Sequence, residues 1–280
     1  MVGPKAKRRA LEVIRDKFEL SVRQSCQILG LRQSTFHYRP KRTRDDTELR
    51  SKIVDVVTRK PRWGRPMVTW MLRERMGLKD NHKRIGRIYR ELGLQMNKRQ
   101  KSRKLSRQKH LLEVPSAPNQ LWAMDFVQDS FANGRRFRIL TIKDLFTHET
   151  LDLYVDISIT GERVAEVLDR LKACGRIPKA IVCDNGSEYV SKAMDQWAYK
   201  NGVELKFIQP GKPTQNAFIE SFNGKLRYEC LDQHWFEDLA QARRIIEEWR
   251  IEYNTERPNK PLGKKTPAEF AIEQGLLLYG

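Results

Sequence analysis

The chain has 280 residues, enough for two or three domains, and carries 54 Lys and Arg against 35 Asp and Glu, a net charge of +19. It contains no run of about 18 apolar residues and no apolar segment behind its basic N-terminus, so neither a transmembrane span nor a secretory signal is expected. The cysteines lie far apart without a C-x-x-C pair, which argues against a zinc finger or a disulfide framework. We expect reduced, buried thiols at Cys26, Cys174, Cys183 and Cys230.

The positive charge is concentrated in the first part of the chain. Residues 1–110 hold 32 Lys and Arg and 10 Asp and Glu, a net of +22, whereas residues 111–280 have a net of −3. Such a region suits a polyanion, because each neutralised phosphate releases condensed counterions. An anionic membrane surface is the alternative, but the basic part shows no long helix with a broad apolar face, and we favour nucleic acid.

Residues 5–40 predict a compact helical unit. Apolar residues recur at helical spacing from Leu11, and Ser21 followed by Gln24 forms a capping box that opens a second helix. After a turn at Gly30 comes a short polar third helix, which gives the order of a helix-turn-helix. An ordinary three-helix packing unit is the alternative. The candidate DNA-binding residues of the third helix are Arg32, Gln33, Ser34 and Thr35.

Residues 46–93 predict a second set of helices. Pro61 and Gly64 end the first, the second ends near Gly77, and Asn81 caps the third. The third helix carries a basic face, which contacts a DNA groove or phosphate, or is simply solvated. Its candidate DNA contacts are Lys83, Arg84 and Arg87.

A basic segment separates the helical regions from the second half. Residues 97–109 contain seven Lys and Arg, no acid and almost no apolar residue. Such a segment cannot bury a core, so we expect a linker that tracks phosphate. Pro115 and Pro118 mark the start of the next domain.

From Leu121 onward the pattern changes to strands. We expect them at 121–127, 137–143, 151–156, 179–184 and 204–208. The turn Asn133-Gly134 predicts a hairpin between the first two, and helices at 161–173 and 190–201 connect the later strands. A three-strand meander followed by alternating helix and strand implies an α/β fold, with a mixed five-stranded sheet flanked by helices. RNase H-like folds have this order, although element order alone leaves other α/β folds open.

Three acids lie where this fold would bring them together. Asp125 is in the first strand, Asp184 ends the fourth, and Glu220 is in a helix expected at about 214–230. If the first and fourth strands are neighbours, both aspartates reach one edge of the sheet and the helix adds the glutamate.

Grouped carboxylates suit the cleavage of a phosphodiester. Negative charge develops on the attacking, leaving and non-bridging oxygens, and two divalent ions about 3.5–4 Å apart stabilise it. Mg²⁺ prefers oxygen ligands, whereas three acids without a cation would repel one another. An aspartate before Asn-Gly is also a simple turn former. Other acids nearby are alternative ligands: Asp129, Asp144, Asp152 and Glu188.

The helix around Glu220 has a polar and an apolar face. Helical spacing groups Asn216, Glu220, Asn223 and Arg227, opposite Phe218, Ile219, Phe222 and Leu226. A glutamate flanked by Asn and Arg fits a metal ligand beside a clamp for DNA phosphate, with Lys225 as a further candidate DNA contact. A plain amphipathic helix is the alternative.

The DDE transposases of bacterial insertion sequences closely resemble this chain in three segments. These are LWAMDF (121–126), IVCDNGSEY (181–189) and FIQPGKPTQNAFIESFNGKLRYECL (207–231). The most similar group is the IS-three type, whose second reading frame, OrfB, ends in a retroviral-integrase-like core with an RNase H-like fold. Similarity extends to RWGRPMVTWMLRERMG (62–77) and YNTERPNKPLGKKTPAEF (253–270), and so to nearly the whole chain.

The resemblance implies a transposase that cleaves DNA and transfers the strands of an insertion sequence by two-metal-ion phosphoryl transfer. It assigns Asp125, Asp184 and Glu220 as catalytic residues and as ligands of Mg²⁺ or Mn²⁺, with two ions and no zinc. It places Arg227 where many relatives carry a lysine two helical turns after the glutamate. The implied partners are the element ends, target DNA and further copies of the chain on DNA. An OrfA partner or an OrfAB fusion is also implied, because no heptad zipper occurs here.

We therefore predict four regions. Residues 1–44 and 45–95 form helix-turn-helix-like and second helical DNA-binding regions, 96–118 is a basic linker, and 119–280 is an RNase H-like integrase core. The chain is expected in the bacterial cytoplasm, associated with the nucleoid and not with a membrane. The rival functions are a non-catalytic DNA-binding regulator of transposition, a structure-selective nuclease of the same fold and an inactive remnant.

Overall fold

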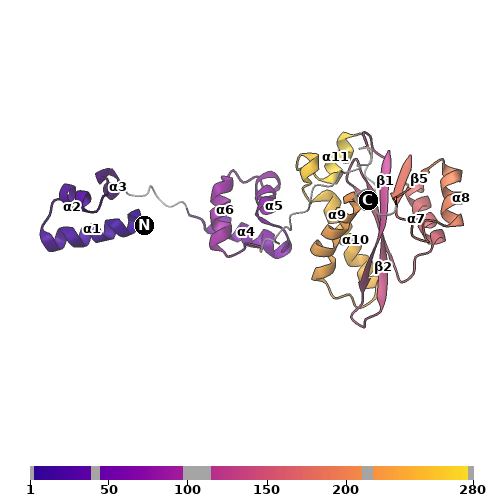
Figure 1. The fold of residues 1–280 in the computed structure, drawn as a ribbon, viewed down its shortest axis with the longest axis horizontal. Helices are drawn as coiled ribbons and strands as arrows, with labels where there is room; N and C mark the ends of the chain where they lie inside the picture. The colour runs from indigo at the N-terminus through magenta and orange to yellow at the C-terminus, as the bar shows by residue number, and fades with distance from the viewer. Residues whose placement is uncertain (1–2, 39–44, 97–114, 210–216, 277–280) are drawn as a thin grey trace. The chain divides into compact units, whose positions relative to one another are not determined.

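The computed structural model describes residues 3–38, 45–96, 115–209 and 217–276 (Figure 1). It divides into two compact units, residues 1–54 and 55–280. In the described ranges no helix is both long enough and apolar enough to cross a membrane.

The first unit contains the helices predicted for residues 5–40. These are α1 (Pro4–Phe18), α2 (Val22–Ile28) and α3 (Gln33–His37). Ser21 accepts a hydrogen bond from the backbone N–H of Gln24, and the Gln24 side chain accepts one from the backbone N–H of Ser21. This confirms the predicted capping box. Gly30 has a φ of +57° in the turn that follows, a conformation that glycine adopts without strain.

The next helices also follow the prediction. They are α4 (Thr47–Arg59), α5 (Arg65–Trp70), η1 (Met71–Arg75) and α6 (His82–Glu91). The π-helical turn η1 prolongs α5 toward Gly77, and the side chain of Asn81 caps α6 by accepting from the N–H of Lys83. Ile85 and Ile88 are buried, so α6 has one apolar and one basic face.

A five-stranded sheet is the centre of residues 115–276. Its strands are β1 (Leu121–Ser130), β2 (Arg136–Asp144), β3 (Thr150–Asp156), β4 (Ala180–Cys183) and β5 (Glu204–Phe207). The order is β3-β2-β1-β4-β5. The pairs β1–β2 and β2–β3 are antiparallel, and β1–β4 and β4–β5 are parallel. The predicted mixed sheet and its hairpin are confirmed, and the first and fourth strands, whose adjacency the sequence had left as a condition, are neighbours.

Alternating residues of β1 enter two separate cores, because successive side chains of a strand point to opposite faces. Leu121, Ala123 and Val127 pack with α9 (Ala217–Glu229) and α10 (Leu239–Thr255). Trp122 and Met124 pack with α7 (Gly161–Ala173) and α8 (Lys192–Asn201) on the other face. Figure 1 shows these two helical layers on either side of the sheet.

The end of the chain contains elements that the sequence analysis did not predict. These are η3 (Leu231–Gln233), α10, η4 (Lys260–Leu262) and α11 (Pro267–Glu273). Ile246 and Tyr253 of α10 are buried against the sheet. One prediction about the cysteines is wrong, because Cys174 is exposed while Cys26, Cys183 and Cys230 are buried.

Candidate active site

Strands β1 and β4 bring two of the predicted site residues to the same edge. Ala123 of β1 pairs with Val182 of β4 in parallel, and β4 ends at Cys183, so Asp184 follows it directly. Asp125 lies two residues beyond Ala123, where β1 continues past the end of β4. Since the carboxyl ends of parallel strands meet at one edge of a sheet, both aspartates belong to this edge.

Electrostatic interactions connect Asp125 with the other two acids. The pKa of Asp125 is raised to about 6, first by burial, and the negative charges of Asp184 and Glu220 raise it too. Two hydrogen bonds to the carboxylate lower the same pKa: one from the backbone N–H of Phe126, 2.8 Å long, and one from the side chain of Asn223. All three predicted acids therefore share one electrostatic environment, in which like charges raise the pKa.

Helix α9 presents Glu220 to this edge by burying its opposite side. Ile219, Phe222 and Leu226 are fully buried, while Glu220 is exposed in the first turn. The predicted apolar face is wrong in one position, since Phe218 is 40% exposed. Asn216, predicted on the polar face, lies outside the described residues.

Asn223 connects α9 to β1 directly. Its Nδ2 donates to Oδ2 of Asp125 over 2.7 Å, and its Oδ1 is buried without a hydrogen-bond partner. The sequence analysis grouped Asn223 with a phosphate clamp and missed this contact. The helical spacing placed Asn223 on the face of Glu220, but nothing in the sequence indicated that this face turns toward Asp125.

The alternative acids have structural partners instead. Asp144 accepts from the backbone N–H groups of Asn119, Phe146 and Thr147 over 2.7, 2.8 and 3.0 Å. The other pairs are Asp129 with Arg227, Asp152 with Arg170, and Glu188 with Arg138. Within the described ranges, none of the three predicted ligands has such an ion pair.

The donor chemistry of this edge suits a hard divalent cation. All three acids offer carboxylate oxygens, the ligands that Mg²⁺ and Mn²⁺ prefer, and the buried Oδ1 of Asn223 adds an unused acceptor beside them. In the part of the chain that the structure describes, no three Asp, Glu, His or Cys side chains already form a closed metal-binding group. The residues fit the ions in chemistry, although their side chains are not gathered into a finished ligand set.

Two further candidates on α9 interact with other parts of the core domain. Arg227 donates to the backbone oxygen of Gln128 over 2.5 Å and lies 3.6 Å from Asp129 and 3.9 Å from Asp232. Lys225 is half-buried, and burial together with the charge of Arg257 lowers its pKa.

The predicted DNA contacts of the helical regions are mostly on the surface. Arg32, Gln33 and Ser34 are exposed at the start of α3, and Thr35 is half-buried. On α6 Lys83 is exposed, Arg84 pairs with Asp80 at 2.5 Å and Arg87 pairs with Glu91 at 2.7 Å. Binding of DNA by these two arginines would compete with Asp80, which precedes the helix, and with Glu91 at its end.

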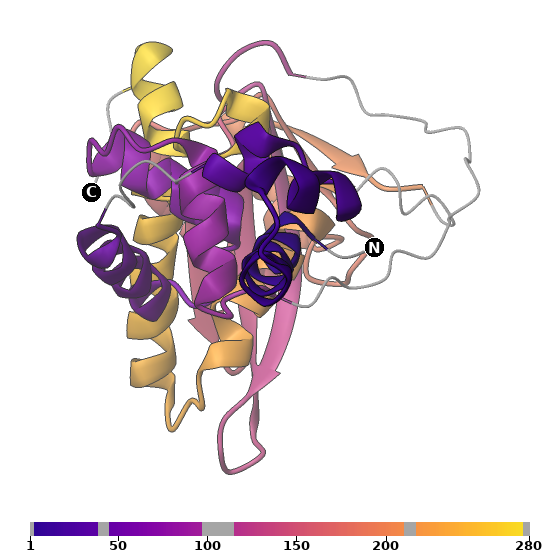
Figure 2. The same ribbon diagram turned by 90° about the vertical axis from the view of Figure 1, so that its left-hand side faces the viewer.

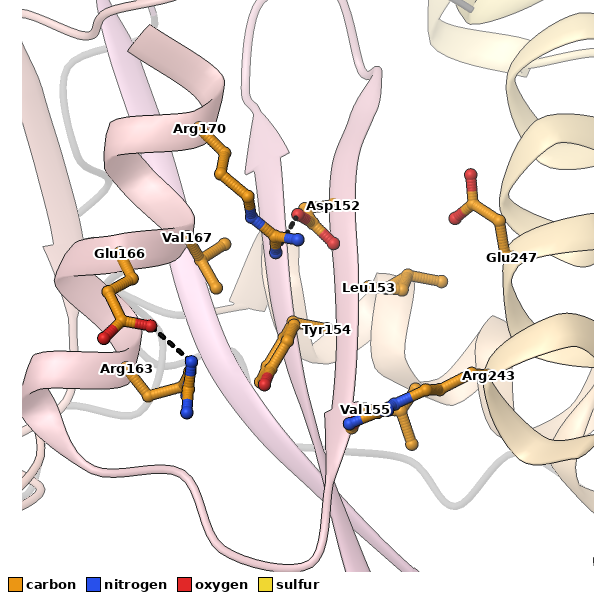
Figure 3. A pocket seen from close by; sticks show the side chains of 10 residues that line it. All are labelled: Asp152, Leu153, Tyr154, Val155, Arg163, Glu166, Val167, Arg170, Arg243 and Glu247. Atoms are coloured by element: carbon orange, nitrogen blue, oxygen red, sulfur yellow. Dashed lines mark hydrogen bonds and ion pairs between the residues drawn. The ribbon is translucent and has the colours of Figure 1, made fainter. Parts of the chain in front are cut away.

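A pocket of about 590 Å³ lies elsewhere, over the edge strand β3 between α7 and α10 (Figure 3). Its arginines are held by acids: Arg170 lies 3.3 Å from Asp152, and Arg243 lies 2.9 Å from Asp156. Strand β3 is separated from β1 by β2. None of the three predicted ligands lines this pocket.

The chain is similar to known families and to proteins of insertion elements. Integrase core domain families match residues 115–213 and 201–267, and an HTH-like domain family matches residues 43–102. The chain is 46% identical to an uncharacterized 31.7 kDa protein of insertion element IS407 from Burkholderia multivorans, over 94% of this chain and 95% of the relative. It is 40% identical to a 39.2 kDa protein of insertion element IS476 from Xanthomonas euvesicatoria, over 96% of this chain and 78% of the relative. The chain belongs to the IS-three-type DDE transposases.

This transposase has the fold expected from the resemblance. A simian T-cell lymphotropic virus intasome structure superposes on it with a TM-score of 0.52, 16% identity, and coverage of 78% of this chain and 73% of the other. At this identity the likeness concerns the fold alone, which is RNase H-like. The two integrase core matches together include Asp125, Asp184 and Glu220. The chain is thus a DNA transposase, an enzyme, with an integrase core behind an HTH-like region.

Proposed function

We propose that Asp125, Asp184 and Glu220 hold the divalent ions with which this transposase cleaves a DNA strand and joins it elsewhere. The observation that supports the proposal best is the pKa of Asp125, which the charges of Asp184 and Glu220 help to raise. Like charges left together without an ion pair favour a bound cation. Of the alternative acids nearby, Asp129, Asp152 and Glu188 each have a cationic partner, and Asp144 accepts from three backbone N–H groups.

The proposed reaction has two steps. Water first cleaves the strand at the element end, and the freed 3′-hydroxyl then attacks another phosphodiester. Two Mg²⁺ or Mn²⁺ ions would supply positive charge for the oxygens that become negative in both steps. The protein positions its carboxylates for this: strand β1 carries Asp125, the turn after β4 carries Asp184, and α9 carries Glu220.

The test is nicking of supercoiled DNA by the purified chain with Mg²⁺, with Mn²⁺ and without either ion. We expect metal-dependent nicking that is lost in Asp184→Asn. Asp195→Asn, which changes an exposed acid of α8, is the matched control and should nick like the unaltered chain. Equal nicking by Asp184→Asn would overturn the assignment. A DNA end that already carries a free 3′-hydroxyl separates joining from hydrolysis, because a nuclease would give no joined product.

The oligomeric state, the OrfA partner and the cellular location belong to the same proposal. We infer that the transposase works as a homo-oligomer on DNA and with OrfA, as a separate chain or a fusion, in the bacterial cytoplasm near the nucleoid. If the purified chain binds DNA without nicking it, addition of OrfA should restore nicking. Failure of that addition would favour a regulator.

A further inference from the structure

One end of the core combines the β1–β2 hairpin with the segment that follows η3. Phe131 forms a parallel bridge with Phe236, and the backbone N–H of Ala132 donates to the oxygen of Phe236 over 2.8 Å. Phe236 is buried and packs edge-on against Phe137, with ring centroids 5.5 Å apart. The two segments lie side by side at the same end of the core in both views (Figures 1 and 2). Backbone and ring contacts thus join them into one continuous surface.

Trp235 gives this surface an exposed indole. Its relative exposure is 85%, whereas Trp122, Trp197 and Trp249 are buried. Neighbouring residues of an extended segment point to opposite sides, so burial of Phe236 directs Trp235 outward. A large aromatic side chain held in water by a fixed backbone is available to a binding partner.

The chemistry around Trp235 favours an anionic partner. Arg135 and Arg136 are exposed in the hairpin, and no acid among the described residues pairs with either guanidinium. Arg136 pairs with Ser130 in the sheet register, and the bridge at Phe131 puts Trp235 beside Ser130. The indole and the Arg136 side chain therefore belong to one row across three adjacent segments.

The acids of this region are mostly engaged in the fold. Asp129 and Asp232 both face Arg227, and Asp238 caps α10 by accepting from the N–H of Gln241 over 2.7 Å. Glu237 is the exposed acid that remains beside Trp235. Among the described residues, Arg135 and Arg136 are thus available to an anion through their own guanidinium groups, while the named groups together carry three positive and four negative charges.

We propose that this surface binds the DNA substrate, with the Trp235 indole stacked on an unpaired base and Arg135 and Arg136 bound to phosphates. Exposed aromatic rings between basic groups are the usual platform for single-stranded DNA, since every base has a π face. Phe131, the residue after the end of β1, lies six residues beyond Asp125, which is about 20 Å at about 3.3 Å per residue. The stacking surface is therefore separate from the proposed metal ligands, and it rests on the proposed function only in taking DNA as the bound substrate.

The test compares Trp235→Ala and Trp235→Phe with Tyr199→Ala, a matched control that removes a 92% exposed ring from α8. Affinity is measured by fluorescence anisotropy in EDTA, so that a failure of the metal site leaves the experiment intact. The probes are a labelled duplex with an unpaired tract and the same duplex fully paired. We expect Trp235→Ala to lose about tenfold affinity for the unpaired tract, as for one stacked base. Trp235→Phe should retain most of it, and Tyr199→Ala should change nothing.

Three outcomes would overturn the stacking proposal: no loss in Trp235→Ala, an equal loss in Tyr199→Ala, or an altered oligomeric state with unchanged DNA affinity. Arg135→Ala and Arg136→Ala should each reduce the salt dependence of binding by about one unit of log–log slope. A 2-aminopurine base moved along the tract reports the position of stacking. Quenching should occur in the unpaired tract and be lost in Trp235→Ala, whether or not Asp125 holds a metal ion.

Discussion

The side-chain amide of Asn223 donates from Nδ2 to Oδ2 of Asp125 over 2.7 Å, which joins helix α9 to strand β1 three residues after Glu220. A bond from an amide to an ionised carboxylate stabilises the ionised form and fixes its direction. Partners of this kind around metal ligands affect metal binding nearly as much as the ligands do.

Asn223→Ala is therefore expected to lower the affinity for Mg²⁺, so that half-maximal nicking requires about tenfold more Mg²⁺. DNA affinity in EDTA should be unchanged. Titration of nicking with Mg²⁺ measures this. Ser221→Ala, at an exposed position of the same helix, is the control. Asn223→Asp adds a like charge and should be worse than Asn223→Ala. If Asn223→Ala and Asn223→Asp both titrate like the Ser221→Ala control, Asn223 has no part in positioning Asp125.

Much of this arrangement could be predicted from the sequence. The strands were predicted because apolar and turn residues alternate in short blocks, whereas the adjacency of β1 and β4 could only be stated as a condition for the site. Phe218 was misplaced because an apolar residue at helical spacing indicates a face only where that face is covered. Helix α10 was not predicted, although its buried residues Ala242, Ile246, Trp249 and Tyr253 recur at helical spacing. Only its burial against β3 is a long-range property that the sequence does not give.

The contacts of the site were harder to predict than its members. Arg227 and Gln128 are 99 residues apart, and Asn223 and Asp125 are 98 apart. Spacing within a helix predicts which residues share a face, but it does not predict which other helix or strand that face contacts. The acids could be chosen only with the resemblance, because Asp144 and Asp152 have the same local pattern and differ in their tertiary partners.

Removal of one acid should stabilise the protein when no metal is present. Asp184→Asn and Glu220→Gln each remove a charge that raises the pKa of Asp125, so unfolding in EDTA should require slightly more free energy. The gain is at most about 1 kcal/mol, since both side chains are exposed to water. Thermal unfolding with and without Mg²⁺ tests this. Mg²⁺ should raise the Tm of the unaltered chain but not of either variant; an equal rise in all three contradicts the ligand assignment.

Arg227 should contribute both to the fold and to DNA binding. Its bond to the Gln128 oxygen is lost in Arg227→Ala, and we expect about 1 kcal/mol less stability. The log–log salt slope of DNA binding should also fall by about one if the guanidinium reaches a phosphate. Arg227→Lys keeps the charge but not the planar fork, so it should restore the slope and not the stability. An unchanged slope in Arg227→Ala would limit this residue to a structural role.

His148 makes the stability of the core dependent on pH. Its pKa is lowered to about 4, by burial first and then by the charges of Lys143 and Lys225. The unfolded chain takes up a proton below about pH 6.5 while the folded chain does not, so the free energy of unfolding decreases as the pH falls from about 6.5 to about 4. At pH 5 the loss is at most about 2 kcal/mol.

The variant His148→Asn should remove this part of the pH dependence. Asparagine tolerates the left-handed backbone at this position, where φ is +60°. Urea denaturation at pH 7.5 and at pH 5 gives the free energy of unfolding of both chains. The unaltered chain should lose more stability between the two pH values than His148→Asn does. Equal losses would show that His148 is protonated in the folded protein as readily as in the unfolded one.

The buried ion pair of Glu229 and Arg257 should be among the most sensitive contacts of the core. Both nitrogen–oxygen distances are 2.6 Å, and both side chains are largely buried. Removal of one partner from a buried pair costs about 3–5 kcal/mol, because the other charge stays unpaired. The positive charge of Arg257 also lowers the pKa of Lys143 and Lys225, so these cations already repel one another.

This asymmetry sets the order of the variants in urea denaturation. Glu229→Gln leaves Arg257 facing Lys225 without its acid and should be the most destabilising change. Arg257→Met leaves Glu229 near Lys225, whose pKa Glu229 raises, and should be milder. The double variant Glu229→Met with Arg257→Met should recover much of the loss, since replacing a whole buried pair by apolar residues is often close to neutral. If Arg257→Met proves worse than Glu229→Gln, the repulsion among these cations is too weak to govern the stability of this part of the core.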